Sequence, residues 1–431
     1  NPLGAGFTEG PIVHHEGGFV PFAARIKQAV DVPVIVAGRI SPERGEEVIA
    51  EGSADLISMG RPLLADPALV SKLGEGRRRE IRPCVYCYVC VAQPFFDQRV
   101  RCAVNPVVAE ETRYAEALRQ PAATRRKVVV VGGGPAGIEA ACTAAQRGHE
   151  VVLFEKASVL GGTWRFAALP YEPNETMLDW LLDRIERLPV EVRLGEEATP
   201  EKITDLAPDV VIAAAGAVRE ASTIPGADLA HVWDGDDLRE VLAGQGTTSK
   251  GRRVPLLPRL AITIGRAIGL TSHPSRLRSA SRLYMPLGRR VTVIGGGLVG
   301  SELADFCAAR GREVTLLERG PVAALEMAHP RRWRVLHELR EAGVRIVTNA
   351  DPLAIEAAAV RFATRAQPDA EAIEETVATD SVIIAEGLAP NPGPLETLRK
   401  TGLPIVPVGD VEGVGYLEGA IHSGFRAAME I

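Results

Sequence analysis

The sequence predicts an α/β protein in which parallel strands alternate with helices. Two glycine-rich turns are the main evidence: each stands between an apolar run suited to a buried strand and the start of a helix, at 132–137 and 295–300. Strand and helix patterns also alternate over residues 1–83. We therefore expect several parallel sheets, each covered by helices.

Composition bounds the class of protein. At roughly 150 residues per domain, 431 residues allow about three domains. A hydrophobic fraction of 46% argues against disorder, and a net charge of −6 argues against a nucleic-acid partner. No apolar run approaches the ~20 residues of a membrane span, and no signal-peptide pattern opens the sequence. We therefore expect a cytoplasmic protein.

Residues 1–83 predict the end of a larger barrel. Only about two β/α units fit this length, whereas a (β/α)8 barrel needs about 250 residues. Asn1–Gly10 has the pattern of a loop, so we expect a fragment whose N-terminal part is missing. Strands are expected at 32–37 (buried on both faces) and 55–59, and helices at 41–50 and 66–73. The loops after these strands carry residues suited to an FMN phosphate, namely Arg39, Gly60 and Arg61; structural ion pairs are the alternative for the two arginines.

Four of the six cysteines gather in a segment at 84–110. They are Cys84, Cys87, Cys90 and Cys102. Three cysteines within seven residues and a fourth close behind suit a [4Fe-4S] cluster, and a structural zinc site is the alternative. Cys142 and Cys307 are expected to be small core residues of helices. Residues 111–126 are polar and alanine-rich, and we expect a linker there.

The first glycine-rich turn predicts a dinucleotide site. It follows a strand and opens a helix, and Glu155 ends the next strand about 20 residues further on, where a ribose hydroxyl is expected. The helix N-terminus would face the pyrophosphate. Its glycines are Gly132, Gly134 and Gly137. We assign this domain to 127–235 and 376–431.

The second turn repeats the pattern within a domain expected at 289–375. Its residues are Gly295, Gly297, Gly300 and the acidic Glu318. A carboxylate accepts the ribose hydroxyls of NADH but repels the 2′-phosphate of NADPH, so NADH is the expected coenzyme. Arg319 would soften this repulsion, but we expect it to be a solvated surface residue.

Two dinucleotide sites in one chain predict a flavin and a nicotinamide. No pair of cysteines between 127 and 431 has the spacing of a redox dithiol. Electrons from the flavin must therefore leave by another carrier, and the cysteine segment supplies one.

A basic insertion is expected at 236–288. Residues 250–290 hold ten Lys or Arg and no acidic residue. Either a packing helix with solvated arginines or a docking surface for an anion or partner fits this pattern, and Arg259 and Arg266 are the candidates for docking.

Together these motifs resemble the bacterial 2,4-dienoyl-CoA reductase and trimethylamine dehydrogenase family, the multidomain members of the old yellow enzyme group. The resemblance rests on Arg39, Gly60-Arg61-Pro62, the cysteines up to Cys102-Ala-Val-Asn105-Pro106 and the two glycine-rich units. It implies an FMN barrel, a [4Fe-4S] segment, an FAD domain and an NAD(P) domain, in that order. It also implies that Gly409 and Asp410 meet the ribityl chain of FAD. The family's proton-donor tyrosine would lie in the missing N-terminal part, which leaves the catalytic residue unknown.

The sequence departs from the family at three places. Ala214-Ala215-Gly216 and Ala385-Glu386-Gly387 stand where the family has Ala-Thr-Gly. The spacing of the first three cysteines is closer to the amine dehydrogenases. His14 and His15 lie near the start and are expected to be loop residues without a role; a position facing the flavin is the alternative.

The resemblance implies an NADH-dependent oxidoreductase. Electrons would pass from NADH to FAD, then to the cluster and to FMN, which would reduce an activated C=C bond of a 2,4-dienoyl-CoA or enoate type of small molecule. One alternative is an amine dehydrogenase or demethylase that sends electrons from FMN through the cluster to a protein acceptor. A non-catalytic electron-transfer module is the other.

Overall fold

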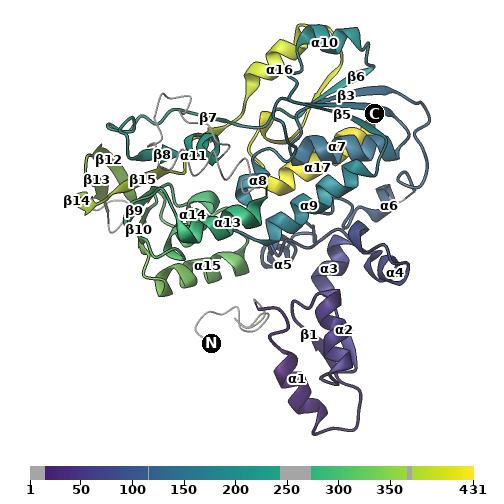
Figure 1. Ribbon diagram of the computed structural model, residues 1–431, viewed down its shortest axis with the longest axis horizontal. Coiled ribbons are helices and arrows are strands. Elements are labelled where there is room, and N and C mark those ends of the chain that lie inside the picture. Colours follow the sequence, from purple (N-terminus) through teal and green to yellow (C-terminus); the bar gives the residue numbers. More distant parts are fainter. Residues whose placement is uncertain (1–14, 115, 243–272, 366–370) are drawn as a thin grey trace.

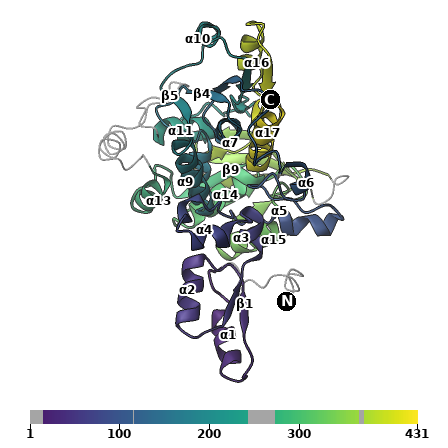
Figure 2. The same ribbon diagram turned by 90° about the vertical axis from the view of Figure 1, so that its right-hand side faces the viewer.

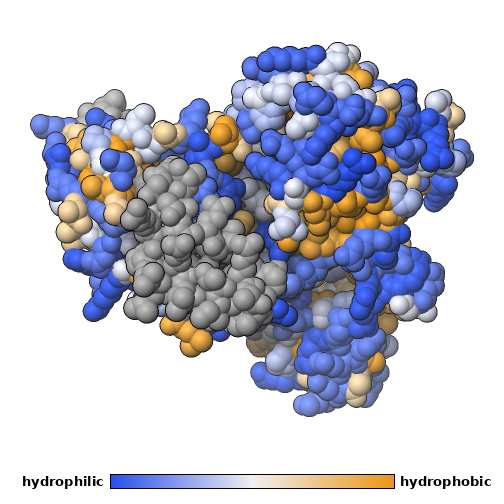
Figure 3. Space-filling view, turned by 45° about the horizontal axis from the view of Figure 1, so that its top comes forward, coloured by the Kyte–Doolittle hydropathy of each residue, from blue (hydrophilic) through white to orange (hydrophobic). Residues whose placement is uncertain are grey.

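A computed structural model describes residues 15–114, 116–242, 273–365 and 371–431. Figure 1 shows two units, each with its own sheet, side by side, and a smaller N-terminal piece beside them. Figure 2 shows this piece extending away from the rest. Figure 3 shows a face on which hydrophilic residues predominate and apolar residues form limited patches. In the part of the chain described, no helix is long and apolar enough to cross a membrane.

The first unit is built on five parallel strands in the order β17-β6-β3-β4-β5. The central strand β3 is almost entirely valine and is buried on both faces, as parallel sheets covered by helices require. Helix α7 follows β3 directly and packs against α9 and α17. The bounds are β3 Lys127–Val131, β4 Glu150–Glu155, β5 Val190–Leu194, β6 Val210–Ala213, β17 Ile405–Pro407, α7 Pro135–Gln146, α9 Pro173–Glu186 and α17 Tyr416–Glu430.

The second unit repeats this plan, with strand order β11-β10-β9-β15-β8 and all four pairings parallel. Helices α14 and α15 pack with it, and an antiparallel sheet of β12, β13 and β14 contributes Phe362 and Ile355 to the core. The bounds are β8 Val232–Asp234, β9 Arg290–Ile294, β10 Glu313–Leu317, β11 Arg345–Val347, β15 Ser381–Ile384, β12 Ala350–Glu356, β13 Ala359–Thr364, β14 Ile373–Ala378, α14 Leu298–Ala308 and α15 His329–Glu341.

The chain crosses between the units at a two-stranded antiparallel ribbon of β7 Val218–Arg219 and β16 Leu388–Ala389. The second unit is therefore larger than the expected 289–375. Strands β8 and β15 lie in its sheet, although the predicted bounds put both segments in the first domain. The reason is that β9 needs a partner on each side, and the repeated strand–turn–helix–strand pattern supplies only β10.

The N-terminal piece contains the expected strand–helix alternation in short form. Strands β1 Ile35–Ala37 and β2 Leu56–Ser58 pair in parallel, and α2 Pro42–Ala50 begins at Ser41, whose hydroxyl accepts a hydrogen bond from the backbone N–H of Arg44 at 3.2 Å. The expectation that β1 is buried on both faces is wrong: Ile35 is 61% exposed. Along β1 the side chains are exposed, buried and exposed in turn, so only one face of the strand is covered in the described residues.

Other short elements connect these parts. The loop expected at Gly60-Arg61-Pro62 is the first turn of α3, and the expected helix 66–73 begins later, as α4. The expected linker 111–126 includes α6, whose Tyr114 is buried against Phe425 with ring centroids 5.0 Å apart. The bounds are α1 Val20–Lys27, α3 Gly60–Ala65, α4 Leu69–Gly74, η3 Arg78–Glu80, α5 Val89–Ala92, η4 Gln93–Phe96, α6 Glu111–Tyr114, α8 Trp164–Ala167, α10 Pro200–Asp205, α11 Gly235–Leu242, α13 Pro274–Leu283, α16 Pro392–Arg399 and η6 Gly409–Val411.

Candidate dinucleotide and cysteine sites

The first glycine turn joins β3 to α7 in a very tight arrangement. Gly132 has a φ of 109°, in the region that favours glycine. A Cβ atom on Gly137 would lie 1.9 Å from the carbonyl oxygen of Gly132, so only glycine fits there. Gly134 is the N-cap of α7, and a Cβ on it would meet no atom within 4 Å. The N-terminus of α7 therefore opens into space, as a phosphate seat requires.

Glu155 is held beside this turn. One carboxylate oxygen accepts the N–H of Gly133 at 2.7 Å, and the other accepts the N–H of Ala157, also at 2.7 Å. These two bonds fix the carboxylate at the carboxyl end of β4, next to the strand that leads into the turn. A ribose bound at the end of the sheet would meet an acceptor whose position is already set.

The second turn reproduces this geometry. A Cβ on Gly300 would lie 1.7 Å from the carbonyl oxygen of Gly295, whose φ is 96°. Glu318 accepts the N–H groups of Gly296 and Gly320, each at 2.7 Å. The structure thus brings together all the residues predicted for each of the two turns.

Arg319 is exposed at the surface, as expected, but its guanidinium also has partners within the chain. Its guanidinium pairs with Asp351 and, at 3.3 Å, with Glu386. Two carboxylates therefore engage the cation nearest to Glu318 along the chain. The guanidinium of Arg319 is therefore poorly placed to compensate the charge of the 2′-phosphate of NADPH.

The late glycine Gly409 and Asp410 lie beside the first turn. A Cβ on Gly409 would approach the Cβ of Ala136, in the first turn of α7, to 2.9 Å. Asp410 accepts the N–H of Gly415 at 2.8 Å, and burial raises the pKa of its carboxyl group. The structure therefore places Asp410 near the first dinucleotide site.

The cysteine segment surrounds its sulfur atoms with backbone N–H groups. The Sγ atom of Cys84 lies 3.4 Å from the nitrogen of Tyr86. Burial raises the pKa of Cys84 and Cys87 to about 12. Burial also raises the pKa of Cys90 and Cys102, and backbone hydrogen bonds from Val89 to Cys87, from Val91 and Cys90 itself to Cys90, and from Val104 and Asn105 to Cys102 offset part of the effect of burial. Among the residues described, no group of three or more His, Cys, Asp or Glu side chains could hold a metal ion as placed.

Arg39 and Arg61 meet at this cysteine loop. The guanidinium of Arg39 lies 4.3 Å from the ring centroid of Tyr86, and that of Arg61 lies 5.2 Å from the same ring and 4.5 Å from Tyr88. Residues predicted to bind an FMN phosphate are thus in contact with the cysteine segment, although some 20 residues separate them from each other along the chain.

Sequence reasoning missed Tyr171, which ties the cysteine loop to both units. Its hydroxyl lies 3.0 Å from the carbonyl oxygen of Val85 and 3.2 Å from that of Tyr86. The guanidinium of Arg331, on α15, lies 4.0 Å from the centre of its ring and pairs with Glu302 of α14. These contacts join residues that are far apart along the chain, so no local sequence pattern predicts them.

A buried ion pair holds α7 against α9 beneath the first site. Arg184 donates to Glu139 at 2.6 Å, and both side chains are almost fully buried. Burial alone would raise the pKa of Glu139, but the charges of Arg184 and Arg82 outweigh it and the pKa is lowered.

We expect Arg184→Met to lower the free energy of unfolding by about 3–5 kcal/mol, because it leaves Glu139 buried without its partner. Chemical denaturation measures this. The control is Arg187→Met, which removes the more exposed pair with Asp183 and should cost no more than about 1 kcal/mol. Equal losses of unfolding free energy in the two variants would contradict the conclusion that the buried pair of Arg184 and Glu139 stabilises the packing of α7 against α9.

The described end of the basic stretch pairs within the chain. Arg278, on α13, donates to the carbonyl oxygen of Ala168 and to Glu175, both at 2.7 Å. At this position the arginine is neither solvated nor free for an external anion. Arg259 and Arg266 lie outside the described residues, as does His14, while His15 is exposed.

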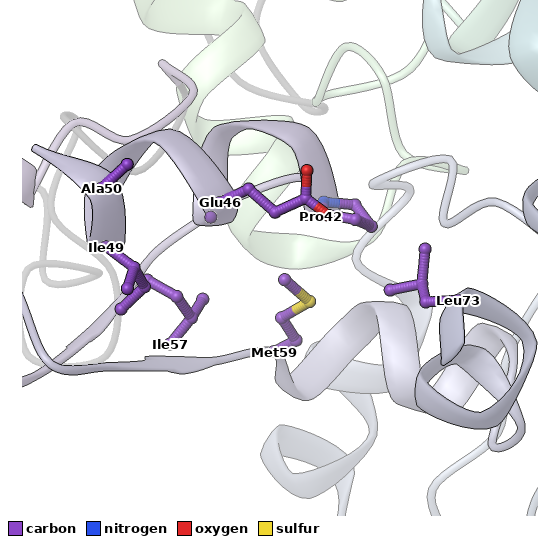
Figure 4. Close-up of a pocket in the computed structure, with 8 residues that line it drawn as sticks. Pro42, Glu46, Ile49, Ala50, Ile57, Met59 and Leu73 are labelled. Atoms are coloured by element: carbon purple, nitrogen blue, oxygen red, sulfur yellow. The ribbon is translucent and has the colours of Figure 1, made fainter. Parts of the chain in front are cut away.

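One apolar pocket lies on the N-terminal piece. Figure 4 shows Met59 between Ile57 and Leu73 in it. None of the predicted site residues lines this pocket.

Comparison with known proteins decides the family. Residues 126–412 match the pyridine nucleotide-disulphide oxidoreductase family. The chain belongs to this family. Residues 13–80 match the NADH:flavin oxidoreductase / NADH oxidase family, so the N-terminal piece is part of a flavin-enzyme barrel, and the predicted α/β fold class is confirmed.

Three similar proteins align with nearly the whole of this chain. An NADH oxidase of Thermoanaerobacter brockii is 34% identical over 98% of this chain and 59% of its own length. The structure of a 2-naphthoyl-CoA reductase complex has a TM-score of 0.81 and 27% identity, over 97% of this chain and 57% of its own. The structure of 6-hydroxypseudooxynicotine amine oxidase from Pseudomonas geniculata has a TM-score of 0.77 and 26% identity, over 96% and 59%. The chain therefore spans less than two thirds of each relative. The predicted resemblance to the dienoyl-CoA reductase and trimethylamine dehydrogenase family is confirmed.

Proposed function

We propose that this chain belongs to an NADH-dependent flavin and iron–sulfur oxidoreductase, in which electrons pass from NADH through FAD and a [4Fe-4S] cluster to FMN and reduce an activated C=C bond. One observation carries the proposal: the cysteine loop contacts both the predicted FMN arginines and, through Tyr171 and Arg331, the two dinucleotide units. Such a position suits a relay between them.

Each cofactor has its own set of residues in this proposal. The first unit would hold FAD with Gly132, Gly134, Gly137 and Glu155, aided by Gly409 and Asp410. The second unit would hold NADH with Gly295, Gly297, Gly300 and Glu318. Arg39, Gly60 and Arg61 would hold the FMN phosphate. In both dinucleotide units the chain supplies a helix N-terminus for the pyrophosphate and a fixed carboxylate for the ribose.

The residues present fit an iron–sulfur cluster better than zinc. When bound, the cluster would supply a one-electron carrier beside the flavins. Structural zinc sites usually take their four cysteines from two C-x2-C pairs that lie well apart, whereas three of these cysteines stand within seven residues. A [4Fe-4S] cluster spreads its four cysteine ligands over separate irons. The backbone N–H groups directed at the cysteine sulfurs supply hydrogen bonds of the kind that tune such clusters.

The coenzyme preference follows from the carboxylates at the second site. We expect kcat/KM for NADH to exceed that for NADPH by about tenfold or more, which corresponds to about 1.4 kcal/mol. Glu318 would repel the 2′-phosphate, while Asp351 and Glu386 engage Arg319. Stopped-flow flavin reduction with each coenzyme measures the ratio. Equal kcat/KM values for NADH and NADPH would contradict this account. The variant Glu318→Ser should lower the ratio of kcat/KM for NADH to that for NADPH.

The amine dehydrogenase alternative draws on the similar amine oxidase structure and on the cysteine spacing. The intact second glycine turn with Glu318 favours the reductase. The test supplies the full-length protein with NADH and either cinnamate or an enoyl-CoA, and separately with a secondary amine and an artificial acceptor. Alkene-dependent NADH oxidation supports the proposal. Amine-dependent acceptor reduction without alkene-dependent NADH oxidation would support the amine dehydrogenase alternative. If the protein showed neither activity, the remaining interpretation would be an electron-transfer module.

A further inference from the structure

The two dinucleotide units share a loop that returns to the glycine turn. In the first unit the N–H of Gly161 donates to the carbonyl oxygen of Gly133 at 2.8 Å, and in the second the N–H of Ala324 donates to that of Gly296 at 2.7 Å. Gly161 and Ala324 each stand six residues after the acidic residue of their unit, and both have positive φ. The two loops are therefore equivalent position by position.

The two loops differ in charge two residues after Gly161 and Ala324. The first unit has Thr163, which is neutral and exposed, and the second has Glu326. One carboxylate oxygen of Glu326 accepts the N–H of Leu298, the first residue of α14, at 3.0 Å. A Cβ on Gly297 would lie 3.0 Å from the other oxygen. The carboxylate thus covers the N-terminus of α14, where the glycine motif places the pyrophosphate.

We infer that Glu326 is a displaceable anion in the pyrophosphate seat of the second site, which NADH must push aside in order to bind. The inference rests on the proposed function, in which the second unit binds NADH. A helix N-terminus favours a negative group, and the carboxylate and the pyrophosphate compete for the same N–H groups. The first site has no such competitor at Thr163. The difference suits a flavin that stays bound and a coenzyme that must leave after each turnover.

The charge of Glu326 also reaches toward the first unit. Burial raises the pKa of Tyr416, the first residue of α17, to about 12, and the charges of Glu326 and Asp410 add to this effect. The carboxylate of Glu326 is therefore near enough to the start of α17 to act on the Tyr416 hydroxyl.

The test compares wild type with Glu326→Gln, which keeps an acceptor for Leu298 but removes the charge, and with Glu326→Thr, which copies the first unit. Isothermal titration calorimetry of the dithionite-reduced flavoprotein under anaerobic conditions, with NADH and with ADP-ribose, gives the dissociation constants without hydride transfer to the flavin. We expect both variants to bind both ligands about two- to fivefold more tightly, and NADH to dissociate more slowly in stopped-flow displacement. Adenosine, which lacks the pyrophosphate, should bind all three proteins equally.

The matched control is Glu313→Gln, which removes a carboxylate at the opposite end of β10 and should change none of these constants. Suppose that wild type binds NADH and that both folded Glu326 variants bind it equally well or more weakly. This result would overturn the role of Glu326 and would leave the proposed function unaffected. Failure of every protein to bind NADH and ADP-ribose would overturn the proposed function and this inference with it.

Discussion

Replacing Gly300 with alanine should abolish the response to NADH while the protein keeps its flavin. The added methyl group would fall 1.7 Å from the carbonyl oxygen of Gly295, so the turn must open and the N-terminus of α14 must move. Overpacking of this kind costs at least about 1–3 kcal/mol, and we expect NADH affinity to fall at least tenfold. Calorimetric titration with NADH and the flavin absorbance of the purified protein measure the two effects.

The internal repeat supplies the reciprocal variant. In Gly137→Ala the methyl group would fall 1.9 Å from the carbonyl oxygen of Gly132, and we expect loss of FAD on purification with NADH affinity retained. Gly393→Ala is the control, because a Cβ there meets no atom within 4 Å. If Gly300→Ala removed the flavin and Gly137→Ala removed NADH binding, the assignment of the two cofactors would be reversed.

The second large effect concerns the four clustered cysteines. Replacement of any one by alanine should remove the iron and sulfide that the anaerobically reconstituted wild-type protein carries, because a thiolate ligand to the cluster is lost. The four variants are Cys84→Ala, Cys87→Ala, Cys90→Ala and Cys102→Ala. Iron and acid-labile sulfide per chain, together with the visible absorbance of the cluster, measure the outcome.

The chain offers matched controls for this experiment. Cys142 and Cys307 are buried in α7 and α14, and Cys142→Ala and Cys307→Ala should leave the iron content unchanged. Stoichiometric zinc in the wild-type protein, without sulfide, would contradict the cluster and support the zinc alternative.

The parts of the structure that the sequence predicts correctly are local. The turns at 132–137 and 295–300 are set by residues within a few positions of each other, since only glycine avoids the clash with the preceding carbonyl group. The start of α2 is likewise set by Ser41 and the proline after it. The acidic residues Glu155 and Glu318 follow at the spacing that one helix and one strand dictate.

The parts that the sequence does not predict depend on contacts between distant residues. The pairing of β15 with β9 joins residues 90 positions apart, so the predicted domain boundary at 376 lies too early in the chain. Tyr171 and Arg331 reach the cysteine loop from two different units. Arg319 lies at the surface as predicted, but its pairing with Asp351 and Glu386 is not predicted because both carboxylates are distant in sequence.

The burial of strand β1 shows the same limit. The apolar run at 32–37 is typical of a strand covered on both faces, and Val36 is indeed buried. Ile35 nevertheless faces outward. An apolar sequence predicts that both faces of a strand can be buried, but it does not predict which segment of the chain covers each face.

An anaerobic titration of the reconstituted protein with NADH, followed by absorbance and electron paramagnetic resonance, tests the central claim most directly. The account predicts that NADH bleaches the flavin and that the signal of a reduced iron–sulfur cluster then develops. A cluster signal that appears with dithionite while NADH leaves both flavin and cluster oxidised would contradict it.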